Sequence, residues 1–304
     1  MYRNSVPISL HAWGLSNAGQ VRDNNEDCFL ALDLTTGAVL NQEHVVSPVV
    51  GNKGFLLMVA DGMGGHEAGE VASRMAIDIV SQHVSTCLAR NHPPSRLAFV
   101  DILTDAVVHA NAAIYQASQS DPKHSGMGTT LTAAGVYDGA AFFAQVGDSR
   151  AYLLRTNSVA QMTQDQNLAT ELAASGTVMS AQMQSEGSFQ NVLLQALGTE
   201  PEVMVPVSFL ELRRGDWIVV CSDGLTNMVS DEVIGNFVHH SSDPQAACQA
   251  LVTAANANGG HDNITVIAAQ CDGPTLPAPQ ASDSPQARKF VISWWYRLVR
   301  YFQR

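Results

Sequence analysis

Several short apolar runs along the chain have the character of buried β-strands. Each spans five or six residues, most of them branched, aromatic or small and apolar. Runs of this length and composition are typical of strands in the core of a sheet. They cover residues 55–60, 131–136, 141–146, 217–221 and 264–269.

Two alanine-rich stretches, at about 68–88 and 95–119, predict helices. In the second, apolar residues recur at spacings of three and four, the period of one helical face. They are Leu97, Val100, Leu103, Val107, Ala110 and Ile114. The strands lie before and after this helix pair and do not alternate strictly with helices. The order favours packed sheets with helices on the outside over a parallel doubly wound sheet.

A change of composition near the C-terminus divides the chain. Residues 273–286 hold four of the twelve prolines and no apolar period, which indicates an extended linker. We therefore place a globular domain at 6–271, a linker at 272–287 and a tail at 288–304. No apolar run reaches the roughly 18–20 residues that a membrane-spanning helix needs.

The 304-residue chain has a net charge of −12 that is unevenly distributed. Residues 1–287 hold 11 of the 16 Lys and Arg and all 28 Asp and Glu, a net charge of −17. Such a body is a poor binder of polyanions, so we expect no nucleic-acid partner, but it suits hard cations. Five scattered cysteines without a CxxC pair, and an N-terminus without a secretory pattern, favour reduced thiols and a cytoplasmic location.

Acidic residues lie at the ends of the predicted strands. Three follow an apolar run and three precede one: Asp61, Asp148, Asp223, Asp262, Glu26 and Asp27. Strand ends can converge on one cleft, where clustered carboxylates repel one another unless cations bind. Oxygen ligands beside glycine suit Mg²⁺ or Mn²⁺ better than zinc, and glycine after Asp61 lets the Gly62 carbonyl face a metal. Each acid taken alone is more often an ordinary turn or cap residue.

Seven short segments stand in a specific order along the chain. They are GQVRDNNED at 19–27, VADGMGG at 59–65, GTTL at 128–131, VGDSR at 146–150, NVLLQALG at 191–198, SDGL at 222–225 and DNIT at 262–265. This order resembles the metal-dependent protein phosphatase 2C family in its bacterial form, over about residues 13–270. The resemblance implies an α+β fold, a four-layer α-β-β-α sandwich of two packed antiparallel sheets flanked by helices. It also implies a variable flap at about 177–190.

The resemblance assigns metal-binding roles to individual positions. Asp61 would bridge two metal ions, Mn²⁺ or Mg²⁺, and the Gly62 carbonyl would bind the second. Asp223 and Asp262 would bind the first. Asp148, together with Asp223, would hold a third and weaker ion. The alternative for Asp148 is a loop acid paired with Arg150.

The remaining positions that the resemblance implies would lie around the metal ions. Glu26 and Asp27 would hold metal-bound waters or lie close to the second metal. Arg22 would bind the substrate phosphate; the alternative is a surface ion pair with Glu26. Asn263 would orient Asp262, although a plain turn amide is an alternative.

The implied activity is hydrolysis of phosphoserine and phosphothreonine in proteins by water activated between the metals. The implied partners are phosphorylated proteins and an opposing bacterial serine/threonine kinase. The alternative is a catalytically silent protein that binds phosphoproteins or acts as a tethered scaffold.

The tail at 288–304 is basic and aromatic. On a helix, its polar residues would form one stripe: Lys289, Ser293, Arg297, Arg300 and Arg304. Apolar residues, including two of the four tryptophans, would cover the rest. Such a segment suits an anionic membrane surface, here the inner face of the membrane, or a groove on the acidic body or on a partner. The two alternatives stand equal.

Overall fold

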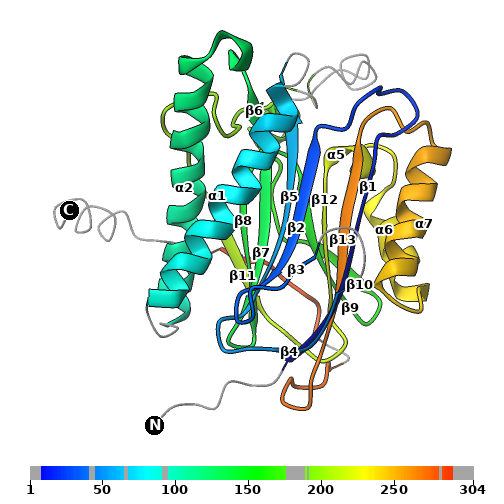
Figure 1. The fold of residues 1–304 in the computed structure, drawn as a ribbon. Helices are drawn as coiled ribbons and strands as arrows, with labels where there is room; N and C mark the ends of the chain where they lie inside the picture. Colours follow the sequence, from blue (N-terminus) through cyan, green and yellow to red (C-terminus); the bar gives the residue numbers. More distant parts are fainter. Residues whose placement is uncertain are drawn as a thin grey trace.

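The computed structural model describes residues 8–40, 45–64, 68–90, 95–175, 189, 192–280 and 283–289. Within these residues the strands form two antiparallel sheets (Figure 1). The first sheet contains, in spatial order, β14 (Arg288–Lys289), β11 (Val207–Glu211), β8 (Ala140–Val146), β7 (Leu131–Tyr137), β5 (Phe55–Met63), β2 (Asp27–Asp33) and β3 (Val39–Leu40), with β6 (Gly128–Thr129) paired to β5. The second contains β10 (Ser158–Gln161), β9 (Arg150–Arg155), β12 (Trp217–Cys221), β13 (Ile264–Asp272), β1 (Ile8–Asn17) and β4 (Val45–Val50).

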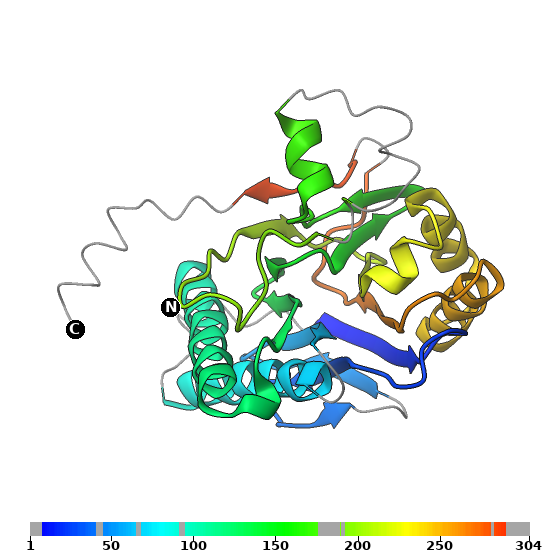
Figure 2. The same ribbon diagram turned by 90° about the horizontal axis from the view of Figure 1, so that it is seen from above.

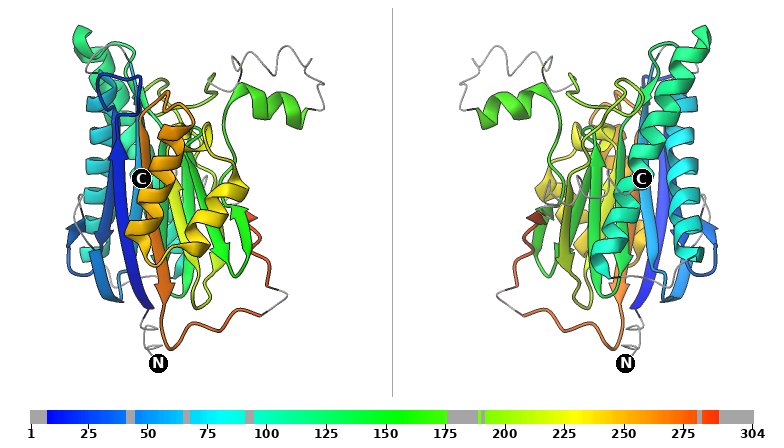
Figure 3. Two further views of the ribbon diagram at one scale, coloured as in Figure 1. Left: turned by 90° about the vertical axis from the view of Figure 1, so that its right-hand side faces the viewer. Right: turned by 90° about the vertical axis from the view of Figure 1, so that its left-hand side faces the viewer.

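The helices cover the outer faces of the two sheets (Figures 2 and 3). Helices α1 (Ala68–Arg90) and α2 (Arg96–Ser120) pack on the first sheet. Helices α6 (Asp231–His240) and α7 (Pro244–Ala257) pack on the second. The shorter elements are the 3₁₀ turn Pro122–His124, α3 (Leu168–Ala174) and α5 (Asp223–Thr226). The expected α+β four-layer sandwich is confirmed.

The continuous apolar run of β5 shows why the sheets are packed on both faces. Successive side chains of a strand point to opposite faces. Leu56 and Met58 pack against the helices, whereas Leu57 and Val59 pack against the second sheet. Both faces of the strand are thus buried, which accounts for an uninterrupted apolar sequence without alternation.

The predicted elements agree with the observed ones. The five apolar runs lie in β5, β7, β8, β12 and β13, and the two alanine-rich stretches form α1 and α2. The side chain of Ser95 caps α2 by accepting a hydrogen bond from the Ala98 N–H. Among the described helices, α2 alone is long and apolar enough to cross a membrane, but half of its apolar window is buried, as in the core helix of a globular domain.

The predicted linker lies against the body. Leu276 is buried, the Arg214 N–H donates to the Pro277 carbonyl, and Arg213 forms an ion pair with Asp283. The helical pattern expected from Lys289 onward is wrong for Lys289 itself, because it forms β14 with Arg288. A strand here satisfies backbone groups on the free edge of β11. Residues 290–304, which carry the rest of the tail prediction, lie outside the described residues.

Candidate active site

The antiparallel topology brings the predicted acids to one end of the sandwich. Asp27 lies directly opposite Asp61 in the register of β2 and β5. In the second sheet, β12 ends just before Asp223 and its antiparallel neighbour β13 begins just after Asp262. The loop that carries Asp148 connects β8 of the first sheet to β9 of the second. We call Asp27, Asp61, Asp148, Asp223 and Asp262 the carboxylate cluster.

Hydroxyl groups fix the backbone of Asp61. Its N–H donates to Thr130 Oγ1 at 3.0 Å, and its carbonyl accepts from Thr129 Oγ1 at 2.8 Å. Thr130 Oγ1 also lies 2.7 Å from Ser149 Oγ, beside Asp148. These contacts hold Asp61 to the loop between the two sheets.

The glycine after Asp61 permits a close approach of three chain segments. A Cβ at Gly62 would lie 2.1 Å from the Gly69 carbonyl oxygen and 2.7 Å from that of Glu26. Neither contact is possible for a larger residue without a shift of the backbone. Gly62 therefore allows β5, the start of α1 and the loop before β2 to meet at the site.

Two carboxyl oxygens in the cluster have no partner. The Oδ1 atoms of Asp27 and Asp223 are shielded from solvent and have no hydrogen-bond partner among the described residues. The other oxygen of each is held, because Ser222 Oγ donates to Asp27 Oδ2 at 2.8 Å and Asn227 Nδ2 donates to Asp223 Oδ2 at 3.1 Å. A shielded oxygen without a partner carries a desolvation cost that a bound cation would remove.

The pKa values of the acids are raised throughout the cluster. Burial and the charges of Asp223 and Asp262 raise the pKa of Asp27 to about 7, although the hydroxyls of Thr265 and Ser222 lower it. Burial and the surrounding acids raise the pKa of Asp61 well above its usual value. Burial, then Asp223 and Asp165, raise the pKa of Asp148 to about 7. Burial and Asp262 also raise the pKa of Asp223. The negative charges of the cluster therefore exceed the positive charge that the surrounding described residues supply.

Two ion pairs were the alternatives to functional roles for Arg22 and Asp148. Neither the pair of Arg22 with Glu26 nor the pair of Arg150 with Asp148 is present among the ion pairs of the described residues. Arg22 Nη2 donates to Asp262 Oδ2 at 2.8 Å, while 55% of its side chain is exposed. Its guanidinium therefore reaches the edge of the cluster and keeps donors directed to solvent. Arg150 pairs with Asp165 at 2.6 Å, and no guanidinium of the described part of the chain forms an ion pair with Asp148.

Asn263 connects Asp262 to the loop that carries Arg22 and Glu26. Its backbone N–H donates to Asp262 Oδ1 at 2.8 Å. Its side chain accepts from the Glu26 N–H and donates to the carbonyls of Ala18 and Asn24. The Asn263 amide therefore positions the 18–26 loop, and only its backbone touches the Asp262 carboxylate.

The donor set fits hard divalent cations. Within the described residues, no three His, Cys, Asp or Glu side chains are arranged so that they could already hold a metal ion together. The unpartnered oxygens of Asp27 and Asp223, together with the raised pKa values, indicate carboxylates whose charge a bound cation would balance. Oxygen donors of this kind suit Mg²⁺ and Mn²⁺. The individual roles assigned to the nine site residues remain predictions.

Comparison with known proteins identifies the family. The chain belongs to the protein phosphatase 2C family, whose model matches residues 40–258. It is 34% identical over 261 residues to a serine/threonine phosphatase of Listeria welshimeri, covering 85% of this chain and 94% of that protein.

Solved structures agree with this assignment. The serine/threonine phosphatase of S. agalactiae superimposes with a TM-score of 0.73 at 30% identity, covering 86% of this chain and 98% of that one. The catalytic domain of the serine/threonine phosphatase PstP, solved with two manganese ions, gives a TM-score of 0.69 at 31% identity, covering 87% and 99%.

The sequence alone did not identify Ser222 or the paired threonines 129 and 130 as parts of the site. All three lie within the family segments, but a hydroxyl beside a strand has no distinctive local pattern. Ser222 touches Asp27, which is 195 positions away in the chain. Only the fold reveals such a contact.

Proposed function

We propose that this chain is a metal-dependent protein phosphatase that hydrolyses phosphoserine and phosphothreonine in proteins. The observation that carries the proposal is the carboxylate cluster at one end of the sandwich, in which one oxygen of Asp27 and one of Asp223 have no partner among the described residues. Every acid that the family pattern requires is present, which argues against a silent scaffold.

The chain's own residues have separable tasks in this reaction. When bound, divalent cations would supply a water of lowered pKa and neutralise charge on the phosphate. Asp61, Asp223 and Asp262 would hold them, with Asp27 behind Asp61 across the β2–β5 pair. Arg22 would bind and orient the phosphate, because a planar guanidinium offers paired donors to phosphate oxygens. No serine or cysteine nucleophile is needed.

Three finer assignments belong to the same proposal. The resident ions are two, Mn²⁺ or Mg²⁺, with a third held weakly by Asp148 and Asp223. The substrates are phosphorylated proteins, including those of an opposing serine/threonine kinase. The working compartment is the cytoplasm, since the five described cysteines are unpaired and three of them are buried.

A phosphopeptide assay tests the activity and the residue class together. Purified full-length protein would be incubated with matched pSer, pThr and pTyr peptides in Mn²⁺, in Mg²⁺ and in chelator. The proposal expects phosphate release from pSer and pThr that requires metal. Absence of release under every metal condition would refute it and favour the silent phosphoprotein binder, and release only from pTyr would overturn the residue class.

A further inference from the structure

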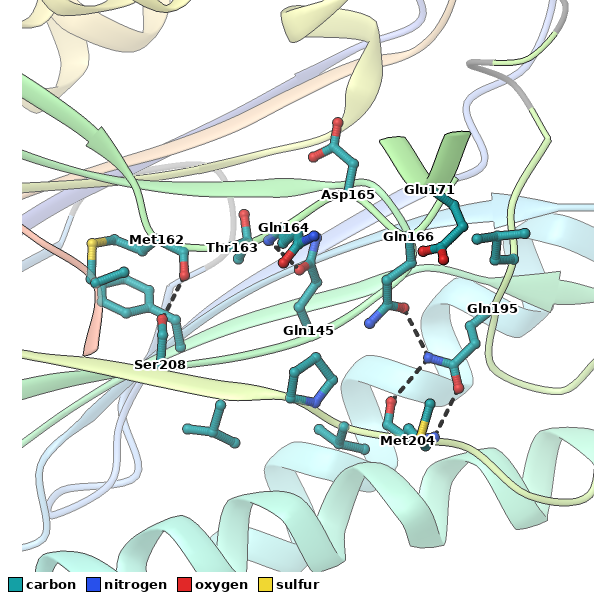
Figure 4. A pocket seen from close by; sticks show the side chains of 16 residues that line it. Gln145, Met162, Thr163, Gln164, Asp165, Gln166, Glu171, Gln195, Met204 and Ser208 are labelled. Carbon is teal, nitrogen blue, oxygen red and sulfur yellow. Dashed lines mark hydrogen bonds between the residues drawn. The ribbon is translucent and has the colours of Figure 1, made fainter. Parts of the chain in front are cut away.

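A pocket of about 730 Å³ opens between the edges of the two sheets (Figure 4). None of the carboxylate cluster lines it. Its walls come from β8, from the segment that follows β10, from α3 and from residues 204–208, which lead into β11. One residue of the pocket lining, Gln166, contacts the loop that carries Asp148. Its Oε1 accepts a hydrogen bond from the Gly147 N–H at 2.8 Å.

The pocket combines apolar walls with an exposed apolar rim. Phe143, Met162 and Val207 form part of the wall. On the rim, Leu194 is 49% exposed and Met204 is 69% exposed, two of the most exposed large apolar side chains among the described residues. Apolar surface of this kind around a concave site indicates a binding surface.

The chain itself leads to this pocket. Ala287 lines it, and β14 follows at once, with Lys289 paired to Ser208 and Arg288 to Phe209 on the edge of β11. Continuing this antiparallel register would bring residue 290 beside Val207, and later residues toward Met204. Because Lys289 is already anchored, the residues after it have an effective concentration on the order of millimolar at the pocket.

The composition of residues 290–304 matches the pocket. They include Phe290, Trp294 and Trp295 for the apolar walls, and three arginines with no acidic residue. On the pocket side, Glu171 is exposed at α3 and forms no ion pair with any described residue. Figure 4 shows its carboxylate turned toward the pocket, whereas Asp165 turns away.

We propose that residues 290–304 of the chain dock into this pocket on their own body, with the aromatic side chains against its apolar wall and an arginine beside Glu171. The inference goes beyond the phosphatase activity and does not depend on it. It decides between the two alternatives for the tail in favour of the acidic body over a membrane surface.

Site-specific photo-crosslinking in the full-length protein tests the docking. A benzophenone amino acid would replace Met204 on the rim, and in a control it would replace Val39, which is 50% exposed on β3. Irradiation of mixed unlabelled and ¹⁵N-labelled protein should give crosslinks from position 204 to residues 290–304 within one chain. Position 39 should give none.

Charge reversal tests the ionic part of the contact. Glu171→Lys should lower the crosslink yield about two- to fivefold, the effect of one exposed ion pair. Asp78→Lys, a matched reversal on α1, should leave the yield unchanged, since α1 contributes no residue to the pocket.

Four results would overturn the proposal. Crosslinks between labelled and unlabelled chains would assign the pocket to a second copy. Crosslinks to residues 176–191 would assign it to that segment. Absence of any crosslink to 290–304 would remove the docking. Loss of the crosslink on addition of phosphatidylglycerol vesicles, with co-sedimentation of the protein, would assign the tail to a membrane.

Discussion

Asp216 and the carboxylate cluster treat the charge of shielded carboxylates in opposite ways. Asp216 is wholly buried, yet both of its oxygens are bound, by Arg155 at 2.8 Å each and by the Arg213 N–H at 2.7 Å. In the carboxylate cluster, Asp27 and Asp223 each keep one shielded oxygen without a partner. Among the described residues, the guanidinium of Arg22 forms an ion pair with Asp262 of the cluster and with none of its other members.

The difference shows which of the two sites needs a cation from outside. A buried charge is stable in a protein only when it is paired or binds a metal. Among the described residues, an arginine binds Asp216 but none binds Asp27, Asp61 or Asp223. We therefore interpret the Arg155–Asp216 pair as structural and the carboxylate cluster as the place where divalent cations bind.

Removal of one acid from the cluster should have the largest effect and tests most sharply whether the cluster binds the catalytic cations. Asp61→Asn or Asp223→Asn should reduce metal-dependent phosphate release more than about a hundredfold, because metal catalysis contributes several kcal/mol to the transition state. In the presence of chelator, both variants should be at least as stable to unfolding as the parent, since each loses a repelling charge. Steady-state hydrolysis and thermal unfolding measure both effects. Parent-like turnover in either variant would contradict the assignment, and Asp78→Asn on α1 serves as the control.

The same substitution at Asp216 should lower stability and leave the metal requirement of the activity unchanged. Asp216→Asn leaves the Arg155 charge buried and unpaired, which should cost about 3–5 kcal/mol of unfolding free energy. The metal requirement should not change at temperatures where the variant is folded. Denaturant unfolding, with and without Mn²⁺, measures the loss. A variant as stable as the parent would show that the pair is not structural.

A smaller effect is expected when a neighbour of the cluster is changed. Ser222→Ala removes the hydroxyl that donates to Asp27 Oδ2. Groups that orient metal ligands contribute roughly 10- to 100-fold to affinity or activity, so Mn²⁺ should bind about tenfold more weakly. Calorimetric titration with Mn²⁺ measures the change. Ser81→Ala, whose hydroxyl only contacts a carbonyl on α1, should bind like the parent.

The smallest expected effect is on pH dependence. In chelator, the folded protein holds protons on Asp27 and Asp148 up to a pKa of about 7, whereas the unfolded chain releases them near its ordinary, lower pKa. The folded state binds up to two more protons between these values, so stability should fall as the pH rises from 5.5 to 7.5, by about 1–2 kcal/mol per pH unit. Saturating Mn²⁺ should remove or reverse this slope, because the metal competes with protons for the same oxygens. Thermal unfolding at both pH values, with chelator and with Mn²⁺, measures the slope, and identical slopes would contradict a shared site.

The fold was largely predictable from the sequence because its strands and helices have strong local patterns. The runs at 55–60 and 264–269 are apolar on both faces, and the helix at 95–119 keeps its period for several turns. The edge strand β14 was not predicted, since two residues have no pattern of their own. Their pairing depends on the exposed edge of β11.

The site was predictable as a set of acids but not in its contacts. The acids at strand ends, such as Asp61 and Asp223, follow apolar runs and are visible locally. That Arg22 contacts Asp262, 240 positions away, depends on the meeting of two distant loops. The same holds for the side chain of Asn263, which binds the 18–26 loop, and for the pocket at the sheet edges.

Anomalous diffraction at the manganese absorption edge, from crystals of the full-length protein equilibrated with Mn²⁺, tests the central claim most directly. The account predicts strong peaks within bonding distance of Asp61, Asp223 and Asp262, and none beside Asp216. A structure with Mn²⁺ in the crystal and no peak at the carboxylate cluster would contradict it.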